Sequence, residues 1–257
     1  MLELKHVNKY YNPGTVNEMC LFNDFNLSVE QGEFVSIIGS NGSGKTSMLN
    51  IICGSISVDE GQVWMNGQDI TNEKEYKRYR HIGRVFQNPA LGTCPSMTIL
   101  ENMSIADNKA KSFNLRRGTD KKRIDHYRDL LRQLNLGLEN KLDTKVGSLS
   151  GGQRQALALL MSTMTPVEFL ILDEHTAALD PKTADLIMEL TDRIVREKHL
   201  TTMMVTHNLR YAVEYGSRLL MMHQGQTFLD LSGKEKEQVR IDDLLEQFNQ
   251  ISIECGN

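Results

Sequence analysis

Nine residues early in the chain combine glycine, hydroxyl and lysine side chains in a spacing that suits phosphate chemistry. They are Gly39-Ser40-Asn41-Gly42-Ser43-Gly44-Lys45-Thr46-Ser47, which fit the pattern G-x-x-x-x-G-K-[ST]. A triphosphate needs many donors at close range, and glycines let successive backbone N–H groups turn inward without a Cβ in the way. Lys45 would reach the β- and γ-phosphates, and the Thr46 hydroxyl would bind Mg²⁺. The loop therefore predicts a site for a nucleoside triphosphate.

Two adjacent carboxylates, Asp173 and Glu174, follow the apolar run Phe169-Leu170-Ile171-Leu172. In open α/β sheets, ligands bind outside the carboxyl ends of the strands. Asp173 would orient the Mg²⁺ shell, and Glu174 would polarise the attacking water as a general base. Two acids after a strand are also common in a solvated turn, so their weight comes from the phosphate-binding loop upstream.

A second candidate anion site is the stretch Leu149-Ser150-Gly151-Gly152-Gln153. A serine and two glycines at the start of a helix aim a hydroxyl and unpaired N–H groups at one point. The chain would then have two helix N-termini that bind phosphate but one lysine-containing loop. We expect the second end to complete the site of another copy, so that two chains sandwich two nucleotides head to tail. Taken alone, the stretch also fits an ordinary N-capped helix.

The elements around these motifs predict an α/β fold, a P-loop NTPase core preceded by an antiparallel β region. Alternating residues 2–7 and 25–29 indicate the β region, with a turn at Asn12-Pro13-Gly14. The run 34–38 predicts a buried strand before the loop, and helical spacing follows it up to Gly54. Strands are also expected at 61–67, 82–86, 169–172 and 202–205. Pro89, after Gln87, is expected to end regular structure.

Helical patterns replace strands between residues 96 and 165, which predicts an inserted α-helical subdomain. Helices are expected at 99–105, 124–136 and 151–164, the second with Tyr127, Leu130, Leu131 and Leu134 on one face. A later helix, 181–197, has Asp180 as its candidate N-cap and Pro181 at its first position. A last helix near the C-terminus contains Leu244 and Phe248.

Composition limits the class of protein. The chain has 257 residues, of which 40% are hydrophobic and 24% charged, which suits one large domain or two small ones. Neither a signal peptide nor an apolar run of roughly 20 residues is present, so we expect a soluble cytoplasmic protein. The net charge of −4 does not favour nucleic acid as a partner. The 4 cysteines show no C-x-x-C pair, which argues against zinc and disulfides.

The order GSNGSGKTS, Gln87, LSGGQ, FLILDE, HTAALD and His207 resembles the nucleotide-binding subunit of ATP-binding cassette (ABC) transporters over essentially the whole chain. The resemblance implies that Tyr11 stacks on adenine, although the residues alone leave Tyr10 as an alternative and allow either ring to pack on the β region. It implies that Gln87 contacts Mg²⁺ or the lytic water and links to the helical subdomain. It makes Asp180 the residue that communicates across the dimer, and His207 the contact to the γ-phosphate.

The resemblance also implies a single ABC ATPase domain over 1–257, with a core at 1–88 and 167–257 and a helical subdomain at 89–166. Its partners would be a second copy of itself and integral membrane permease subunits at the cytoplasmic face of the membrane. The stretch DEHTAALDPKTA is similar to bacterial importers of amino-acid-type solutes, which would add an external solute-binding protein.

Two positions depart from the common family pattern. His175 stands where many cassettes have proline after the catalytic glutamate, and Thr46-Ser47 reverses the commoner order of the two hydroxyl residues. Neither change removes a catalytic group. The competing reading is a soluble ABC ATPase without transport, such as an iron–sulfur assembly factor. A clamp on DNA or ribosomes is disfavoured, because the chain has neither a long coiled coil nor a second cassette.

Overall fold

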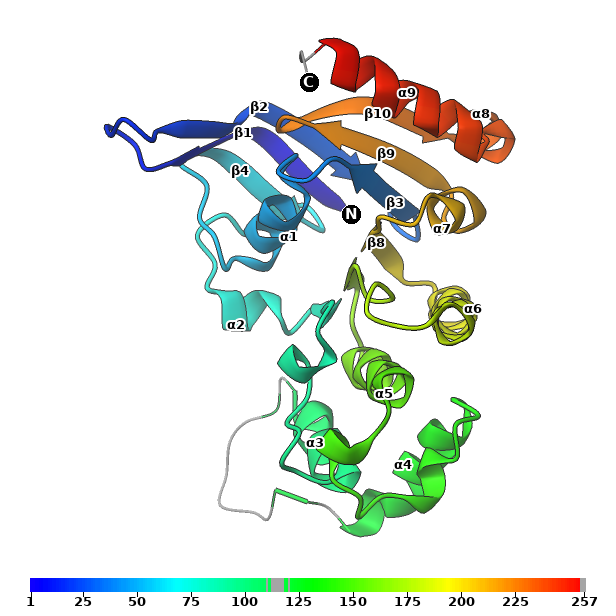
Figure 1. Cartoon of the computed structure of the whole chain (residues 1–257). Helices are drawn as coiled ribbons and strands as arrows, with labels where there is room; N and C mark the ends of the chain where they lie inside the picture. Colours follow the sequence, from blue (N-terminus) through cyan, green and yellow to red (C-terminus); the bar gives the residue numbers. More distant parts are fainter. Residues whose placement is uncertain (110, 112–117, 120, 255–257) are drawn as a thin grey trace. The chain divides into compact units, whose positions relative to one another are not determined.

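A computed structural model describes residues 1–109, 111, 118–119 and 121–254 in two compact units, Met1–Tyr79 with His199–Asn257, and Arg80–Lys198 (Figure 1). The predicted division into 1–88 with 167–257 and 89–166 stays a prediction. None of the helices in the described part of the chain combines the length and the apolar character needed to cross a bilayer.

The first unit begins with the antiparallel β region that the sequence predicts. Its strands are β1 (Leu2–Tyr11), β2 (Met19–Val29), β4 (Glu60–Met65) and β5 (Gln68–Asp69), in the order β2-β1-β4-β5. The alternation in β1 buries Leu2 and Leu4, and an irregularity at His6, whose φ is 51°, shifts the pattern by one residue so that Val7 is buried next. One face of this sheet therefore belongs to the core, as expected for period-2 patterning.

The same unit contains a sheet with the order β10-β9-β3-β8, made of β10 (Gln226–Ser232), β9 (Arg218–His223), β3 (Phe34–Gly39) and β8 (Thr201–Val205). Strand β3 pairs in parallel with both β8 and β9, and all its residues are buried. This explains its continuous apolar sequence.

Short and amphipathic helices complete the first unit. They are α1 (Lys45–Cys53), α2 (Glu75–Arg78), α7 (Leu209–Glu214), α8 (Gly233–Gln238) and α9 (Ile241–Glu254). Helix α9 lies along β9 and β10 in Figure 1, and its Leu244 is buried with Ile38, Leu219 and Met221. Cys53 at the end of α1 is fully buried.

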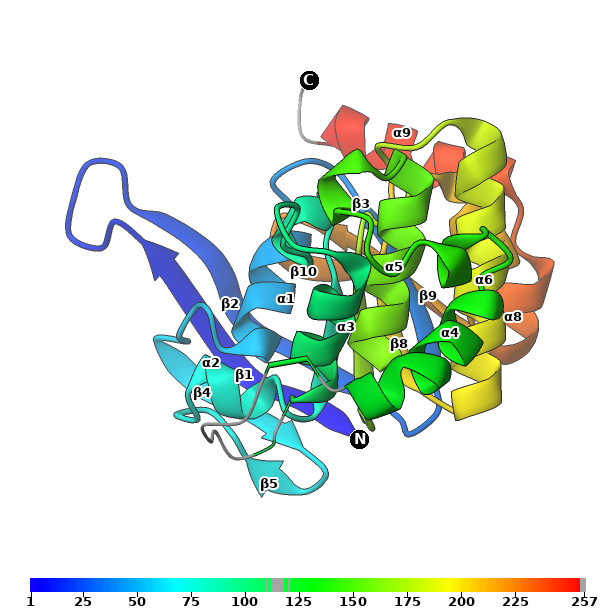
Figure 2. The ribbon, with the colours of Figure 1, turned by 90° about the horizontal axis from the view of Figure 1, so that it is seen from below.

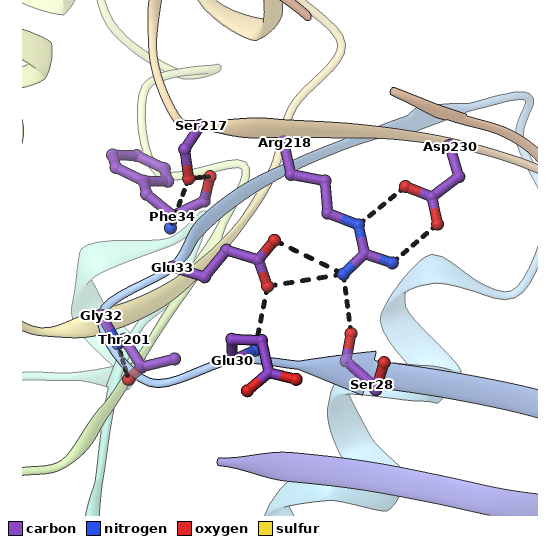
Figure 3. Close-up of polar contacts among 9 residues, drawn as sticks. All are labelled: Ser28, Glu30, Gly32, Glu33, Phe34, Thr201, Ser217, Arg218 and Asp230. Atoms are coloured by element: carbon purple, nitrogen blue, oxygen red, sulfur yellow. Dashed lines mark hydrogen bonds and ion pairs between the residues drawn. The ribbon is translucent and has the colours of Figure 1, made fainter. Parts of the chain in front are cut away.

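Arg218 joins three strands of the first unit (Figure 3). Its guanidinium donates two hydrogen bonds to the Asp230 carboxylate in β10, at 2.7 and 2.6 Å, and one to the Ser28 carbonyl in β2, at 2.8 Å. Glu33, just before β3, accepts a longer contact of 3.4 Å. The neighbouring Asp230 carboxylate, helped by Glu33, raises the pKa of Arg218 further above its already high value. One side chain thus ties the antiparallel sheet to the sheet that carries the loop.

The second unit contains two parallel strands and the helical insertion. The strands are β6 (Ile82–Val85) and β7 (Phe169–Asp173), and the helices are α3 (Ile99–Asp107), α4 (Ile124–Arg132), α5 (Gly151–Thr163) and α6 (Pro181–Lys198). Helix α5 contacts α3, α4 and α6, which surround it in Figure 2. Short 3₁₀ helices at Pro89–Leu91, Lys121–Arg123, Leu138–Asn140 and Val146–Ser148 connect these elements.

Two local predictions are wrong. Pro89 does not end regular structure but begins a 3₁₀ turn, because the Asn88 side chain accepts a hydrogen bond from the Ala90 amide at 3.0 Å. The helix predicted for 124–136 ends at Arg132, and Asn135 adopts a left-handed backbone with φ 55°. Asparagine tolerates this conformation better than most residues.

Candidate functional site

The loop between β3 and α1 requires glycine at both of its ends. Gly39 has φ 153°, and a Cβ there would lie 2.2 Å from the Met222 carbonyl oxygen. Gly44 has φ 100°, and a Cβ there would lie 2.9 Å from the Phe22 ring. Backbone N–H groups can therefore line the loop only if these positions carry no side chain. This is the geometry of a phosphate cradle at a helix N-terminus.

The Lys45 side chain lies across this loop and is only 5% exposed. Its ammonium donates to the carbonyl of Gly39 at 2.9 Å and to that of Ser40 at 2.8 Å, and the Ser43 hydroxyl oxygen lies 3.5 Å away. Neutral oxygens of the loop thus hold the cation at the place where the sequence predicts phosphate charge.

Of the two candidate tyrosines, Tyr11 is connected to the helix that follows the loop. Its hydroxyl lies 3.3 Å from Oγ of Ser47 in the first turn of α1, next to the exposed Thr46. The Lys9 ammonium lies 5.8 Å from the centre of the Tyr11 ring. The phenol of Tyr10 instead lies near Cys20, and the interaction with that side chain raises the pKa of Tyr10. This geometry favours Tyr11 as the aromatic side chain of the site.

His207 lies at the same sheet edge as the loop. In the parallel register of β3 and β8, Ile37 is opposite Val205, and the Thr206 amide donates to the Ile37 carbonyl at 3.0 Å. Two places further along, His207 is level with Gly39, and it is exposed. The register therefore places His207 at the sheet edge where the 40–47 loop begins, and Tyr11 contacts the end of the same loop through Ser47.

One neighbour of the loop was not predicted. His223, at the end of β9, places Nδ1 3.4 Å from Oγ of Ser40, and the Gly225 amide donates to the Ser43 carbonyl at 3.1 Å. The turn between β9 and β10 thus supports the loop from the side. Only the pairing of β9 with β3 places it there, and no local sequence signal indicates that pairing.

Asp173 is the last residue of β7 in the second unit, and Glu174 follows it. Val85 of β6 is opposite Leu172, so Gln87 is level with Glu174 at the carboxyl edge of the two strands. The Asp173 side chain is 12% exposed, and its Oδ2 accepts a hydrogen bond of 2.8 Å from Arg84 of β6. Arg84 is a further residue that the sequence analysis missed.

The backbone of Glu174 turns sharply away from the strand direction. Its φ is 47°, in the left-handed region that glutamate seldom adopts. Such a conformation costs on the order of 1–3 kcal/mol and persists only where the surroundings impose it. The turn leaves Glu174 half-buried beyond the fully buried β7.

His175 anchors the turn that follows Glu174. It is 2% exposed, and its Nε2 lies 3.2 Å from Oγ1 of Thr191 in α6. That hydroxyl donates its only proton to the Ile187 carbonyl at 2.7 Å, so Nε2 of His175 must be the donor to Thr191. Burial lowers the pKa of His175 to about 4, which keeps the imidazole neutral at pH 7. A hydrogen bond to α6 thus fixes this turn.

The stretch Ser150–Gln153 forms a capping box at the start of α5. Oγ of Ser150 accepts from the Gln153 amide at 3.2 Å, and Oε1 of Gln153 accepts from the Ser150 amide at 3.3 Å. Ser150 and Gly151 are exposed, whereas Gly152 is buried against Thr183 of α6. The ordinary capped helix is thus present, and it displays the exposed hydroxyl that the anion-site prediction needs.

Asp180 and Gln87 are both exposed in the second unit. Oδ1 of Asp180 accepts from the Thr183 amide at 3.1 Å, and the Thr183 hydrogen bonds lower the pKa of Asp180. Gln87 follows Phe86, whose carbonyl accepts from Gln155 of α5 at 3.2 Å. The segment after Gln87 is therefore tied to the helix that begins at Ser150.

The donor set of these residues fits a nucleotide with a magnesium ion. The 40–47 loop supplies N–H groups and the Lys45 cation for phosphate oxygens. Thr46, Gln87 and Asp173 carry side-chain oxygens, the ligand type that Mg²⁺ prefers over nitrogen or sulfur. Thr46 belongs to the first unit, and Gln87 and Asp173 belong to the second.

Comparison with known proteins agrees with this chemistry. The family described as "ABC transporter" matches residues 22–177. A "Tyrosine transport ATP-binding protein" of Clostridioides difficile (strain R20291) is 50% identical over 248 residues, covering 96% of this chain and 98% of that protein. The "Spermidine/putrescine import ATP-binding protein PotA" of Haemophilus influenzae (strain ATCC 51907 / DSM 11121 / KW20 / Rd) is 32% identical over 235 residues, which cover 91% of this chain and 59% of PotA.

Solved structures of cassettes have the same fold. The dimeric post-hydrolysis state of the ATP-binding cassette MJ0796, bound to ADP and Pi, has a TM-score of 0.76 and 31% identity. The match covers 90% of this chain and 98% of the MJ0796 chain. The ADP conformation of MJ1267, a cassette of an ABC transporter, has a TM-score of 0.81 and 27% identity, over 100% of this chain and 99% of its own.

Proposed function

The chain belongs to the ABC transporter family and is an ATPase. We propose that its ATP hydrolysis powers the uptake of a small solute of amino-acid type through separate membrane permease subunits. The observation that carries the proposal is the 50% identity to a tyrosine transport ATP-binding protein along nearly the full length of both chains. The alternative of a soluble ABC ATPase without transport is not favoured, because the relatives named above carry transport or import in their names.

We assign each predicted residue a role in ATP hydrolysis. Tyr11 would stack on adenine, and the loop Ser40, Asn41, Gly42, Ser43, Gly44, Lys45, Thr46 and Ser47 would hold the phosphates. Mg²⁺, when bound, would neutralise phosphate charge, with Thr46, Gln87 and Asp173 as its protein ligands. Glu174 would accept the proton of the attacking water, and His207 would contact the γ-phosphate.

Two copies would form each complete site. Ser150, Gly151, Gly152 and Gln153 of one chain would face the γ-phosphate bound by the other chain, with Asp180 linking the two sites. The exposed Ser150 residue and the α5 N-terminus would supply the donors for this contact. The dimeric state of the MJ0796 cassettes supports the arrangement.

We propose that the permease binds the segment after Gln87, at the cytoplasmic face of the membrane. This segment carries Leu91, which is 69% exposed, and it is connected to α5 through Phe86 and Gln155. Met97 and Leu100, which follow it, are half-buried. An exposed apolar residue shortly after Gln87, the proposed Mg²⁺ ligand, would give the permease a way to respond to ATP. An external solute-binding protein would complete an importer.

Purification of the tagged chain from its native membrane tests the proposal. We expect integral membrane subunits and a solute-binding protein to co-purify, and uptake of tyrosine or a related amino acid to be lost when the chain is deleted. Recovery of the chain without any membrane protein would contradict the transport role. Unchanged uptake of every amino acid would contradict the solute class.

Substitutions at the docking segment refine the test. Leu91→Asp should release the permease because it places a charge on the contact surface, and Met97→Asp with Leu100→Asp should do the same. Leu245→Asp, at an exposed position of α9 in the first unit, is the matched control and should keep the complex. Normal assembly and transport with all three docking substitutions would show that the permease binds elsewhere.

A further inference from the structure

An arginine lies inside the second unit, against the carboxylate to which we assign a magnesium role. Arg84 is in β6, and its side chain is 6% exposed, while that of Asp173 in β7 is 12% exposed. The register pairs Arg84 with Ile171, and side chains two apart on a strand share a face, so Arg84 and Asp173 face the same side. Their atoms Nη2 and Oδ2 are 2.8 Å apart.

A second contact fixes the position of the guanidinium. The carbon Cζ of Arg84 lies 4.7 Å from the centre of the Phe86 ring, a cation–π geometry. Phe86 directly precedes Gln87, and its carbonyl is held by Gln155. The Arg84 side chain is thus held between Asp173 at the end of β7 and Phe86, which precedes Gln87.

The ion pair offsets the free-energy cost of burying the Asp173 carboxylate. A carboxylate with so little access to water costs several kcal/mol unless a positive charge accompanies it. Arg84 supplies that charge when no metal is present. A magnesium ion would also bring positive charge to this carboxylate, so the two cations would be alternatives at it.

We propose that Arg84 is a positioning residue that acts as the internal counter-ion of Asp173 and competes with Mg²⁺ for it. The inference rests on the proposed magnesium role of Asp173. Arg84 keeps the carboxylate in place between catalytic cycles, and in doing so it raises the divalent-cation concentration at which the site fills. Without Arg84, the Asp173 carboxylate has no paired positive charge from this side chain and binds the metal more tightly.

Binding of Mn²⁺, which electron paramagnetic resonance detects directly, tests this without any turnover. The wild-type chain and Arg84→Met are titrated with Mn²⁺ in the presence of a non-hydrolysable ATP analogue. We expect the half-saturating Mn²⁺ concentration to fall on the order of tenfold in Arg84→Met, because the cation that pairs with the Asp173 carboxylate and competes for it is removed. Arg84→Gln, also neutral, should shift it in the same direction, and it decides the question if Arg84→Met does not fold.

Two controls define the specificity of the effect. Arg84→Lys keeps a positive charge and should stay close to the wild-type value. Arg128→Met removes an arginine of the same unit whose ion pair with Asp125 is solvent-exposed, and it should change nothing. An equal shift in Arg128→Met would mean that general charge, and not the contact with Asp173, is responsible, and would overturn the inference.

Asp173→Asn separates this inference from the proposed function. It should weaken Mn²⁺ binding, and adding Arg84→Met to it should bring no further tightening, since the carboxylate is already gone. If Asp173→Asn leaves Mn²⁺ binding unchanged, the magnesium role of Asp173 is wrong and the inference falls with it. If Asp173→Asn weakens binding while Arg84→Met and Arg84→Gln bind Mn²⁺ as wild type does, only the role of Arg84 is wrong.

Discussion

Gly152 should be required for packing of α5 on α6, independently of any contact with phosphate. A Cβ at this position would lie 2.2 Å from Cγ2 of Thr183. Carbon atoms normally approach to about 3.5–4.0 Å, so Gly152→Ala forces the helices apart by roughly 1.3–1.8 Å or distorts a side chain. Overpacking of this kind costs about 1–3 kcal/mol, against about 0.5–1 kcal/mol gained by replacing glycine in a helix.

Thr183→Ser removes the clashing methyl group and keeps the hydroxyl. The remaining Thr183 atoms, Cβ and Oγ1, would lie 3.6 and 3.8 Å from the new Cβ, which are ordinary contacts. We therefore expect Gly152→Ala to lower the free energy of unfolding in the wild-type background and to be neutral or stabilising in the Thr183→Ser background. The coupling energy of the cycle should be about 1–3 kcal/mol.

Urea unfolding without nucleotide measures all four proteins of this cycle. Equal destabilisation by Gly152→Ala in both backgrounds would refute the packing argument. ATP hydrolysis by the stable double variant then gives a separate answer. If Gly152 must also lie close to the nucleotide of the opposite chain, hydrolysis stays low although stability is restored.

Three further outcomes follow from single side chains. Lys45→Ala should weaken binding of a fluorescent ATP analogue on the order of 100-fold, because a phosphate charge loses its buried partner, and unchanged affinity would remove Lys45 from the site. Arg218→Met should cost about 3 kcal/mol in the free energy of unfolding, since Asp230 and Glu33 lose their cation. The exposed Arg240→Met should cost about 0.5 kcal/mol, and an equal loss in both would contradict the proposed role of Arg218. Because the pKa of His175 falls from 6.5 to about 4 in the fold, its stabilising effect is complete above pH 6.5 and is lost as the pH falls towards 4. This should lower the free energy of unfolding by about 3 kcal/mol over that range. His175→Asn should remove this part of the pH dependence. A pH profile of the unfolding free energy identical to that of the wild type would contradict the role of His175.

The sequence predicted those parts of the site that depend on local chemistry. The 40–47 loop and the capping box at Ser150 are defined by residue types at fixed spacing along one stretch of chain. The β region was visible because one buried face imposes a period of two. The wrong C-terminal end of the helix after residue 124 reflects weak local signals, since only the left-handed turn at Asn135 stops it.

Contacts that depend on register and on helix approach were not predictable. The pairing of Arg84 with Asp173 requires the relative position of β6 and β7, which are separated by more than 80 residues in sequence. The approach of Gly152 to Thr183 requires the distance between α5 and α6. The pattern at each of these positions is compatible with many pairings, and only the assembled core selects one.

Glu174→Gln tests whether Glu174 is the general base and whether ATP joins two copies of the chain. The variant keeps the size and hydrogen bonding of Glu174 but lacks the basic carboxylate, so hydrolysis should fall about 10²–10⁴-fold. Removing a negative charge near the γ-phosphate should not weaken ATP binding. The ATP-bound state should therefore persist long enough to be isolated. Hydrolysis at the wild-type rate would refute Glu174 as the base.

The molar mass of Glu174→Gln, measured by light scattering during size exclusion, tests the shared ATP site most directly. We expect a dimer in Mg-ATP and a monomer in ADP, because the triphosphate would link the 40–47 loop of one chain to Ser150 of the other. Adding Ser150→Arg should return the protein to monomer in Mg-ATP. A monomer at saturating Mg-ATP, or a dimer that Ser150→Arg leaves intact, would contradict a site built from two copies.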